Sequence, residues 1–319
     1  VNDKRTDNID LATFYSSVLL REQRHQDVVN LIESFLSQPE LPDSAWNNYI
    51  FALRALGNLQ ASLSANQQWT KAKPNSIAAL MSLVVSYELI NEPQKALSTI
   101  KSMEQRFGQT IDTKLTRIYF LILDRQLGVA KSEFDSLSDY SDIEKIPFYK
   151  GLRGRLAYFS EDYASAAADL REAYNETRNE KTFKFLVSAL KASDRTAEAI
   201  TLLKEYSDSR PNDLLSLLQL ADLAAGFEAE VEEAAYIQIL KISPKNLYAS
   251  NNYAMLLLSQ NNLRQAKAII DNVLFENQLH PDLIDTAARI SHAQGDTVSG
   301  NELFEFLVQK TKGEYAIYL

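Results

Sequence analysis

The sequence predicts an all-α protein, and three observations lead to this fold class. Only 9 of the 319 residues are Gly and only 8 are Pro, too few for the many turns of an all-β chain. Hydrophobic residues make up 45% of the chain, which is enough to bury a core and excludes general disorder. Apolar and small residues recur at helical spacing, and this pattern itself repeats about every 34 residues.

The composition excludes several classes of function. The chain has 33 basic and 42 acidic residues, a net charge of −9, so neither nucleic acid nor an anionic membrane surface is an expected partner. Because there is no cysteine, disulfides, thiolate catalysis and cysteine-ligated metals are excluded. No uninterrupted apolar run exceeds the length of the one at residues 118–123, which is far shorter than the ~18 residues of a transmembrane helix, so no transmembrane span is predicted.

A repeat organises nearly the whole chain. A small residue stands four positions before an apolar one at regular intervals, as in Ala96/Ile100 and Ala199/Leu203. When each small residue is placed at position 20 of a unit, the units begin at Ile9, Asp43, Ile77, Ile111, Pro147, Glu180, Leu214, Leu247 and Pro281. We therefore expect a lead-in over residues 1–8 and one repeat array over residues 9–319.

Each unit predicts two amphipathic helices. Positions 4, 7, 8 and 11 share one face of the first helix, and the small residue at position 20 lets the second helix approach closely. Proline near position 32, as at Pro74 and Pro211, ends the second helix because it lacks an N–H. In the second unit, the pattern reads Trp46, Tyr49, Ile50, Leu53, Gly57, Ser62 and Trp69. One unit cannot bury its apolar face alone, so neighbouring units are expected to stack.

Three segments depart from the regular period. The fourth and fifth units begin 36 residues apart, which predicts a longer loop around residues 138–142. In the seventh unit, Gly226 and the acidic run after it shift the second helix by about one residue. The apolar tail over residues 314–319 is expected to fold back on the last unit.

The period and the pattern resemble those of tetratricopeptide repeat (TPR) proteins, and the resemblance covers nearly the whole chain. No single unit carries the complete signature, so the shared period is what makes the resemblance specific. It implies an all-α, right-handed superhelical solenoid of about nine helix-turn-helix units. It also implies that positions 2, 5, 9 and 12 of each first helix line the concave face, where a partner protein segment would bind.

No pattern in the chain predicts catalysis. His25, His280 and His292 are not spaced as metal ligands, and neither a nucleophile motif nor a phosphate-binding glycine loop is present. Carboxylate pairs such as Glu232 and Glu233 are expected to be solvated in an acidic helical protein. The sequence therefore predicts a protein that is not an enzyme and that has neither a cofactor nor a metal.

The concave positions define a candidate peptide-binding groove. Its residues are Asn47, Phe51, Arg54, Tyr119, Arg155, Tyr158, Lys181, Lys184, Lys191, Leu215, Leu218, Tyr248, Asn251 and Met255. In the third and fourth units the same positions also hold Met81, Val85, Glu88, Leu115 and Ile122.

The central groove positions predict a basic strip, which stands out in an acidic chain. Arg155 and three lysines (181, 184 and 191) would lie beside Tyr119 and Tyr158. Basic groups next to aromatic rings suit an extended protein segment with acidic residues or a terminal carboxylate. In the alternative interpretation, the lysines are solvated and the tyrosines pack between helices.

Two short segments carry a finer resemblance. Residues 251–254 (Asn-Asn-Tyr-Ala) and 280–287 (with Pro281 and Asp285-Thr286) resemble the last two units of many bacterial TPR proteins, among them envelope lipoproteins of exosortase/PEP-CTERM sorting and exopolysaccharide export. The sequence departs from that pattern at 287–289, where Ala-Ala-Arg replaces Leu-Gly-Trp.

The finer resemblance implies an assembly factor in a bacterial envelope, exopolysaccharide or protein-sorting pathway. The periplasm or envelope is then favoured over the cytoplasm, with an N-terminal signal or lipid anchor removed. The start at Val1 agrees with processing and equally with a trimmed cytoplasmic chain. The alternative function is a structural or oligomerisation scaffold that makes contacts through convex faces or chain ends.

Overall fold

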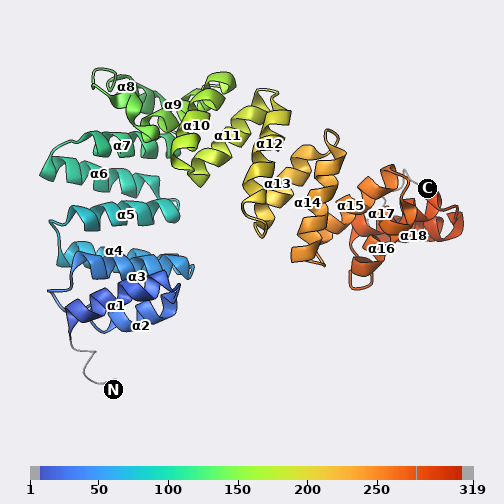
Figure 1. The fold of residues 1–319 in the computed structure, drawn as a ribbon, viewed down its shortest axis with the longest axis horizontal. Helices are drawn as coiled ribbons and strands as arrows, with labels where there is room; N and C mark the ends of the chain where they lie inside the picture. The colour runs from blue at the N-terminus through green and yellow to red at the C-terminus, as the bar shows by residue number, and fades with distance from the viewer. Residues whose placement is uncertain (1–7, 278, 311–319) are drawn as a thin grey trace. The chain divides into compact units, whose positions relative to one another are not determined.

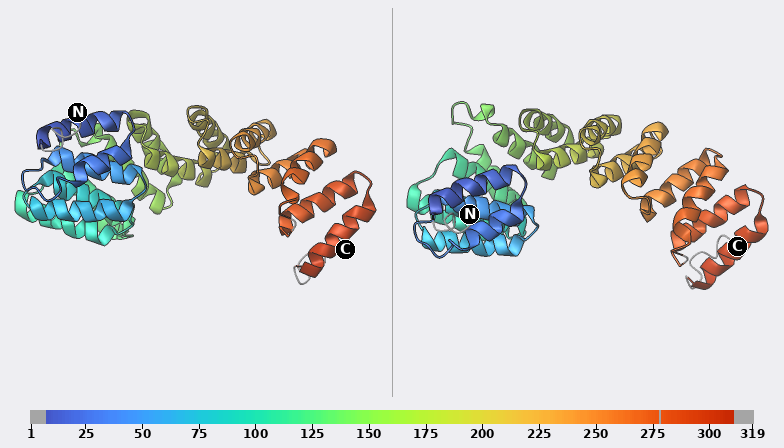
Figure 2. Two further views of the ribbon diagram at one scale, coloured as in Figure 1. Left: turned by 90° about the horizontal axis from the view of Figure 1, so that it is seen from below. Right: turned by 60° about the horizontal axis from the view of Figure 1, so that its bottom comes forward.

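The computed structural model describes residues 8–277 and 279–310, which form a series of helix pairs (Figure 1). These residues contain 18 α-helices, one 3-10 helix and no strand, and the predicted all-α class is confirmed. The chain divides into two compact units, and the boundary along the sequence falls between residues 185 and 186. Two further views of the helix pairs are given in Figure 2. The apolar tail over 314–319 lies outside the described residues.

The first unit contains ten complete helices, a 3-10 helix and the start of an eleventh α-helix. They are α1 (Ile9–Arg21), α2 (His25–Glu33), α3 (Asp43–Ala55), α4 (Leu59–Ala72), α5 (Ile77–Leu89), α6 (Pro93–Phe107), α7 (Ile111–Leu123), α8 (Leu127–Asp135), η1 (Ile143–Lys145), α9 (Pro147–Phe159), α10 (Tyr163–Thr177) and α11 (Glu180–Ala192).

The second unit begins within α11 and contains seven further helices among the described residues. They are α12 (Thr196–Asp208), α13 (Leu214–Ala224), α14 (Ala229–Ile242), α15 (Leu247–Ser259), α16 (Leu263–Leu274), α17 (Pro281–Ala293) and α18 (Thr297–Lys310).

The helix bounds follow the repeat in the sequence. The first helix of each pair begins at the residue that starts a repeat unit. The second helix begins 16 residues later in eight pairs and 15 residues later in the α13–α14 pair, which is the shift predicted for the seventh unit. The longer connection between α8 and α9 contains η1. A single array over residues 9–319 stays a prediction.

A residue in the left-handed conformation reverses the chain inside each helix pair. It is Gly57 with φ of 76° in the second pair, whereas the first pair places Gln23 there with φ of 58°. In eight of the nine pairs this residue stands two positions before the second helix. Left-handed residues commonly end helices because they let the last carbonyls be satisfied while the chain turns. The repeated turn therefore accounts for the constant helix spacing.

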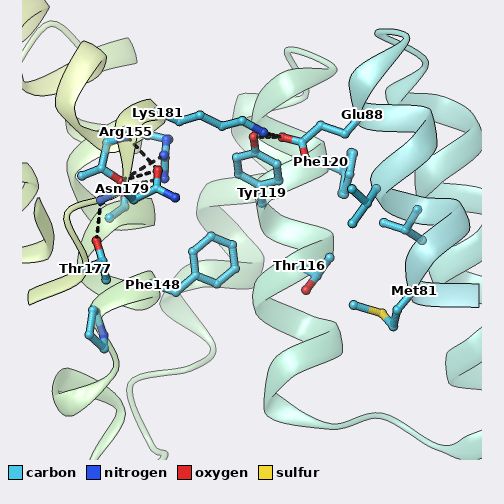
Figure 3. Close-up of a pocket in the computed structure, with 15 residues that line it drawn as sticks. Met81, Glu88, Thr116, Tyr119, Phe120, Phe148, Arg155, Thr177, Asn179 and Lys181 are labelled. Atoms are coloured by element: carbon cyan, nitrogen blue, oxygen red, sulfur yellow. Dashed lines mark hydrogen bonds and ion pairs between the residues drawn. The ribbon is translucent and has the colours of Figure 1, made fainter. Parts of the chain in front are cut away.

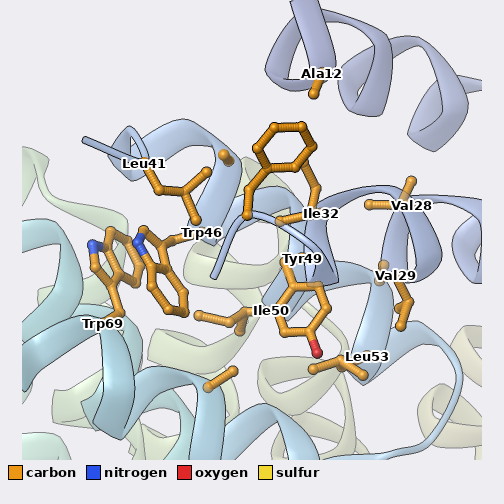
Figure 4. Close-up of a cluster of buried hydrophobic side chains, with 14 of the residues drawn as sticks. Ala12, Val28, Val29, Ile32, Leu41, Trp46, Tyr49, Ile50, Leu53 and Trp69 are labelled. Atoms are coloured by element: carbon orange, nitrogen blue, oxygen red, sulfur yellow. The ribbon is translucent and has the colours of Figure 1, made fainter. Parts of the chain in front are cut away.

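Two stacked tryptophans fill the N-terminal core of the first unit (Figure 4). Trp46 of α3 and Trp69 of α4 have ring centroids 6.4 Å apart and ring planes within 5° of parallel. Both side chains are at most 1% exposed. The indole Nε1 of Trp69 donates a hydrogen bond of 3.0 Å to Asp43 Oδ1, so the buried polar atom of this large ring is satisfied.

The carboxylate of Asp43 joins three helices. Besides Trp69 of α4, it accepts a hydrogen bond of 2.6 Å from Ser76 Oγ at the start of α5. Lys73 Nζ lies 3.2 Å from Asp43 Oδ1. Burial alone would raise the pKa of Asp43, but the hydrogen bonds from Ser76, Trp69 and Lys73 outweigh it and lower the pKa below its ordinary 3.8.

This lowered pKa predicts a pH-dependent contribution to stability. The stabilisation by ionised Asp43 is fully present above the pKa of the unfolded chain and is lost as pH falls through the folded-state pKa. We expect Asp43→Asn to lower the free energy of unfolding by about 1 kcal/mol at pH 7, since the carboxylate is partly solvent-screened. In urea titrations, this difference from the wild type should shrink below about pH 4.

Helices α9 and α10 approach each other closely at Gly154. A Cβ atom at Gly154 would lie 2.6 Å from Leu170 Cγ and 3.1 Å from the backbone N of Leu170. Leu170 is fully buried, so it has little room to move. A glycine is therefore required by the packing of this pair.

We expect Gly154→Ala to destabilise the first unit by about 2 kcal/mol through overpacking. The matched change Gly128→Ala in α8 meets no atom within 4 Å, and it should stabilise the helix by about 0.5–1 kcal/mol. Denaturant midpoints with unchanged slopes would measure both effects. Equal midpoints for the two variants would contradict close packing at Gly154.

Candidate peptide-binding site

A cavity of about 420 Å³ lies among the first helices of the first unit (Figure 3). Its walls come from α5, α7, α9, the end of α10, the connection between α10 and α11, and the start of α11. It is lined by Met81, Val84, Val85, Glu88, Thr116, Tyr119, Phe120, Pro147, Phe148, Gly151, Arg155, Thr177, Asn179, Lys181 and Thr182. All of these residues belong to one compact unit.

Helical spacing brings the lining residues to one surface. Met81, Val85 and Glu88 follow one another at i, i+4 and i+7 along α5, so they share a face. On α9, Gly151 and Arg155 are likewise four residues apart. Stacking α5, α7 and α9 side by side then joins these faces into one hollow.

One end of the cavity is apolar and aromatic. The ring of Tyr119 packs edge-on against Phe120 at 5.3 Å and lies 5.9 Å from Phe148. Phe148 and Val85 are each 38% exposed, so they present apolar surface to an incoming ligand. Met81 and Phe148 lie away from the charged residues in Figure 3. This end suits a bulky apolar side chain.

Arg155 is a buried cation in the cavity wall. Arg155 is only 3% exposed. The central carbon of its guanidinium lies 5.5 Å from the ring centroid of Tyr119 and 5.2 Å from that of Phe185. Its hydrogen bonds are long, 3.3 Å from Nη1 to the carbonyl of Gly151 and 3.4 Å from Nη2 to Thr182 Oγ1. Among the described residues, Nε has no hydrogen-bond partner. Buried charges are normally fully hydrogen-bonded, so this guanidinium has spare capacity for an anion.

The charge of Arg155 persists despite its burial. Desolvation lowers the pKa of Arg155, and the nearby Tyr119 and Glu88 act in the opposite direction. Because the ordinary pKa of arginine lies far above neutrality, the guanidinium remains protonated at pH 7.

An ion pair crosses the polar end of the cavity. Glu88 of α5 accepts hydrogen bonds from Lys181 Nζ of α11 and from the hydroxyl of Tyr119. Burial raises the pKa of Tyr119, and the hydrogen bond to Glu88 adds to this effect. Glu88, Arg155 and Lys181 are the charged lining residues in the described chain, so the cavity wall carries a net charge of +1.

The cavity brings together only part of the predicted basic strip. Tyr119, Arg155 and Lys181 line it, and Arg155 is almost completely buried in its wall. Lys184 instead pairs with Glu180 on its own helix at 2.6 Å, and Tyr158 packs against Phe159, Tyr163 and Phe185. Lys191 is exposed in the second unit. Of the four basic residues in the predicted strip, Arg155 and Lys181 therefore line the cavity, and the two other lysines do not.

The predicted groove residues of the second repeat, which starts at Asp43, lie outside the cavity. Asn47 is exposed, and Phe51 is exposed with its ring 6.0 Å from that of His25. Arg54 donates hydrogen bonds to Ser82 O at 2.9 Å and to Ser86 Oγ at 3.0 Å. Burial lowers the pKa of Arg54. Its guanidinium therefore connects α3 to α5.

The C-terminal groove residues fall into two groups. Leu215, Tyr248 and Met255 are exposed and Leu218 is half-buried, and the hydroxyl of Tyr248 donates a hydrogen bond to Asp222. In contrast, Asn251 Oδ1 accepts a hydrogen bond of 2.7 Å from Thr286 Oγ1. This bond joins α15 to α17 and connects the two segments of the finer sequence resemblance.

Several lining residues were absent from the predicted site. Phe148 stands at position 2 of the fifth repeat unit, so the rule that selected Arg155 could have found it. Thr177 is the last residue of α10, and Asn179 lies in the connection to α11. Groove positions were predicted only on the first helix of each pair, so neither residue could be found in that way. Leu115 and Ile122, read as groove positions, are each 1% exposed and belong to the core, and Thr116 lines the cavity instead.

Comparison with known proteins identifies the fold. No protein-family model and no curated protein sequence matches the chain. A chain of the APC/C hetero-tetramer Cut9-Hcn1 aligns with a TM-score of 0.55 and 15% identity over 79% of this chain and 49% of its own length. A tetratricopeptide repeat protein from Parabacteroides merdae aligns with a TM-score of 0.55 and 13% identity over 78% and 98%.

These likenesses show that the chain has the TPR fold. The chain spans about half the length of the Cut9-Hcn1 chain that it matches. Within the described part, none of the helices combines the length and the apolar character needed to cross a bilayer.

Proposed function

We propose that the chain is a non-catalytic interaction module that binds a segment of a partner protein in the first-unit cavity. The observation that carries this proposal is the buried, incompletely hydrogen-bonded guanidinium of Arg155 in the cavity wall. An unsatisfied buried cation costs stability, and such sites are characteristic of ligand binding.

The chemistry of the cavity suits an acidic residue beside a bulky apolar one. A carboxylate would complete the hydrogen bonding of Arg155, and the net charge of +1 on the wall would attract it. The apolar neighbour would pack between Met81 and Phe148. A cavity of about 420 Å³ holds two or three side chains, which is the size of a short linear motif.

A peptide-display selection tests this function. The full chain is immobilised and panned against a random 12-residue library, with negative selection on the Arg155→Met variant. We expect the enriched peptides to share an Asp or Glu within two residues of a Phe, Leu, Ile or Trp, and to bind more weakly as salt rises. Failure to enrich any such motif would refute the proposed ligand class.

A second candidate function is a scaffold that makes contacts through apolar surface outside the cavity. The outer face of α1 favours it, because Leu11, Phe14 and Tyr15 are 42%, 68% and 44% exposed. A scaffold contact of this kind would show as a rise of molar mass with concentration in light scattering. It would also strengthen, or stay constant, as salt rises.

We also propose that the chain is an assembly factor in a bacterial envelope, exopolysaccharide or protein-sorting pathway. The support is the resemblance at residues 251–254 and 280–287, whose Asn251 and Thr286 are hydrogen-bonded to each other. Fractionation of the source cells would test this placement. Recovery in the cytoplasmic fraction alone would contradict it.

A further inference from the structure

Glu88 occupies the end of the cavity where a ligand carboxylate would bind. Its carboxylate already accepts hydrogen bonds from Lys181 and Tyr119, and it is close enough to Arg155 to influence the pKa of that residue. The Lys181 side chain is 53% exposed and lies at the mouth of the cavity, whereas the Glu88 side chain is 17% exposed, mostly buried but in contact with solvent. Figure 3 shows Lys181 reaching over Tyr119 to Glu88.

We infer that Glu88 is a built-in competitor, and that the cavity admits a ligand carboxylate by exchanging it for the carboxylate of Glu88. This inference rests on the proposed function. In the ligand-bound state, the incoming carboxylate takes the N–H groups of Arg155 and the ammonium of Lys181. Glu88 turns further into solvent, to which its side chain is already partly exposed.

The exchange makes Glu88 a determinant of specificity. A carboxylate ligand replaces one set of charge-assisted hydrogen bonds by another, so Lys181 is never left without an anion. A neutral amide of the same shape cannot compensate Lys181, so it does not displace Glu88. The wild-type cavity should therefore discriminate between Glu and Gln in a ligand more sharply than the cationic residues alone would require.

The experiment compares single and double variants of the full chain. The probes are the strongest acidic peptide recovered by display and its counterpart with Gln or Asn in place of the acidic residue. Calorimetric titration is performed with the wild type, Glu88→Gln, Lys181→Gln and the double variant. The control Glu92→Gln removes the same charge three residues after α5 ends, outside the cavity. Thermal melting verifies that each variant is folded.

Competition predicts opposite effects of the two single changes. Glu88→Gln should bind the acidic peptide on the order of tenfold more tightly, with a steeper salt dependence, because the cavity wall then carries +2. Lys181→Gln should bind it on the order of tenfold more weakly, and the double variant should fall between them. Glu92→Gln should match the wild type.

Two other outcomes have distinct meanings. If Glu88 only ties α5 to α11, folded Glu88→Gln and Lys181→Gln will both weaken binding, which overturns the inference and leaves the proposed function standing. If no acidic peptide binds the wild type or Glu88→Gln above the level of its amide counterpart, both the inference and the proposed ligand class fail.

Discussion

Arg155→Met is expected to abolish binding of the selected acidic peptide while the free energy of unfolding stays within about 1 kcal/mol of the wild type. The side chain is almost completely buried and makes only long hydrogen bonds. A methionine of similar length avoids the desolvation of a charge and still packs against Tyr119 and Phe185. The lost cation–π contacts offset part of that gain.

The matched control is Arg153→Met on the same helix. Arg153 lies outside the cavity and pairs with Glu144 and Asp169, each at 2.7 Å. It is partly exposed, so its loss should cost about 1 kcal/mol of stability and leave peptide binding unchanged. Calorimetric binding and urea unfolding of both variants give the comparison. A large loss of stability in Arg155→Met would make this arginine a structural residue and remove the main support for the ligand site.

Trp69→Ala is expected to have the largest effect on stability, a loss of about 4 kcal/mol. The indole ring is fully buried, stacks on Trp46 and donates to Asp43. Its removal leaves a cavity between α3 and α4 and takes one of the hydrogen bonds from the Asp43 carboxylate. Because repeat units stabilise mainly their neighbours, amide exchange should accelerate most in α3, α4 and α5.

Phe51→Ala provides the comparison on the same helix pair. Phe51 is 55% exposed, so its truncation should change the unfolding free energy by less than about 0.5 kcal/mol. A Trp69→Ala loss no greater than that of Phe51→Ala would show that the stacked pair does not hold this core together.

The repeat predicted the fold because the residue types that recur with its period are the ones that pack neighbouring helices together. A small residue at Ala96 or Ala166 allows close helix approach, and both are fully buried. Such contacts lie between neighbouring helices, so a one-dimensional pattern determines them. The left-handed turn residues were less visible in the sequence, since only three of the nine, Gly57, Gly226 and Gly295, are glycines, whereas residues such as Gln23 and Glu161 adopt the same conformation.

The candidate site was less predictable, because the repeat period does not show how deeply each groove side chain is buried. The rule placed Tyr119, Arg155 and Lys181 on the concave side, and these three residues do meet. It could not show that Phe185 covers Arg155, or that Gly151 leaves space beside it. The partner of Lys181 is 93 residues away at Glu88, and such a pairing depends on the stacking of α5, α7, α9 and α11.

Site-specific cross-linking measures directly where the acidic peptide binds. A photoreactive benzoylphenylalanine replaces Phe148 at the mouth of the cavity, or Phe227, which is 71% exposed before α14, as the control. We expect the peptide to cross-link from position 148 through the apolar residue next to its acid, and to lose this cross-link in the Arg155→Met background. Equal cross-linking from 227, or cross-linking at 148 that survives Arg155→Met, would contradict binding in the first-unit cavity.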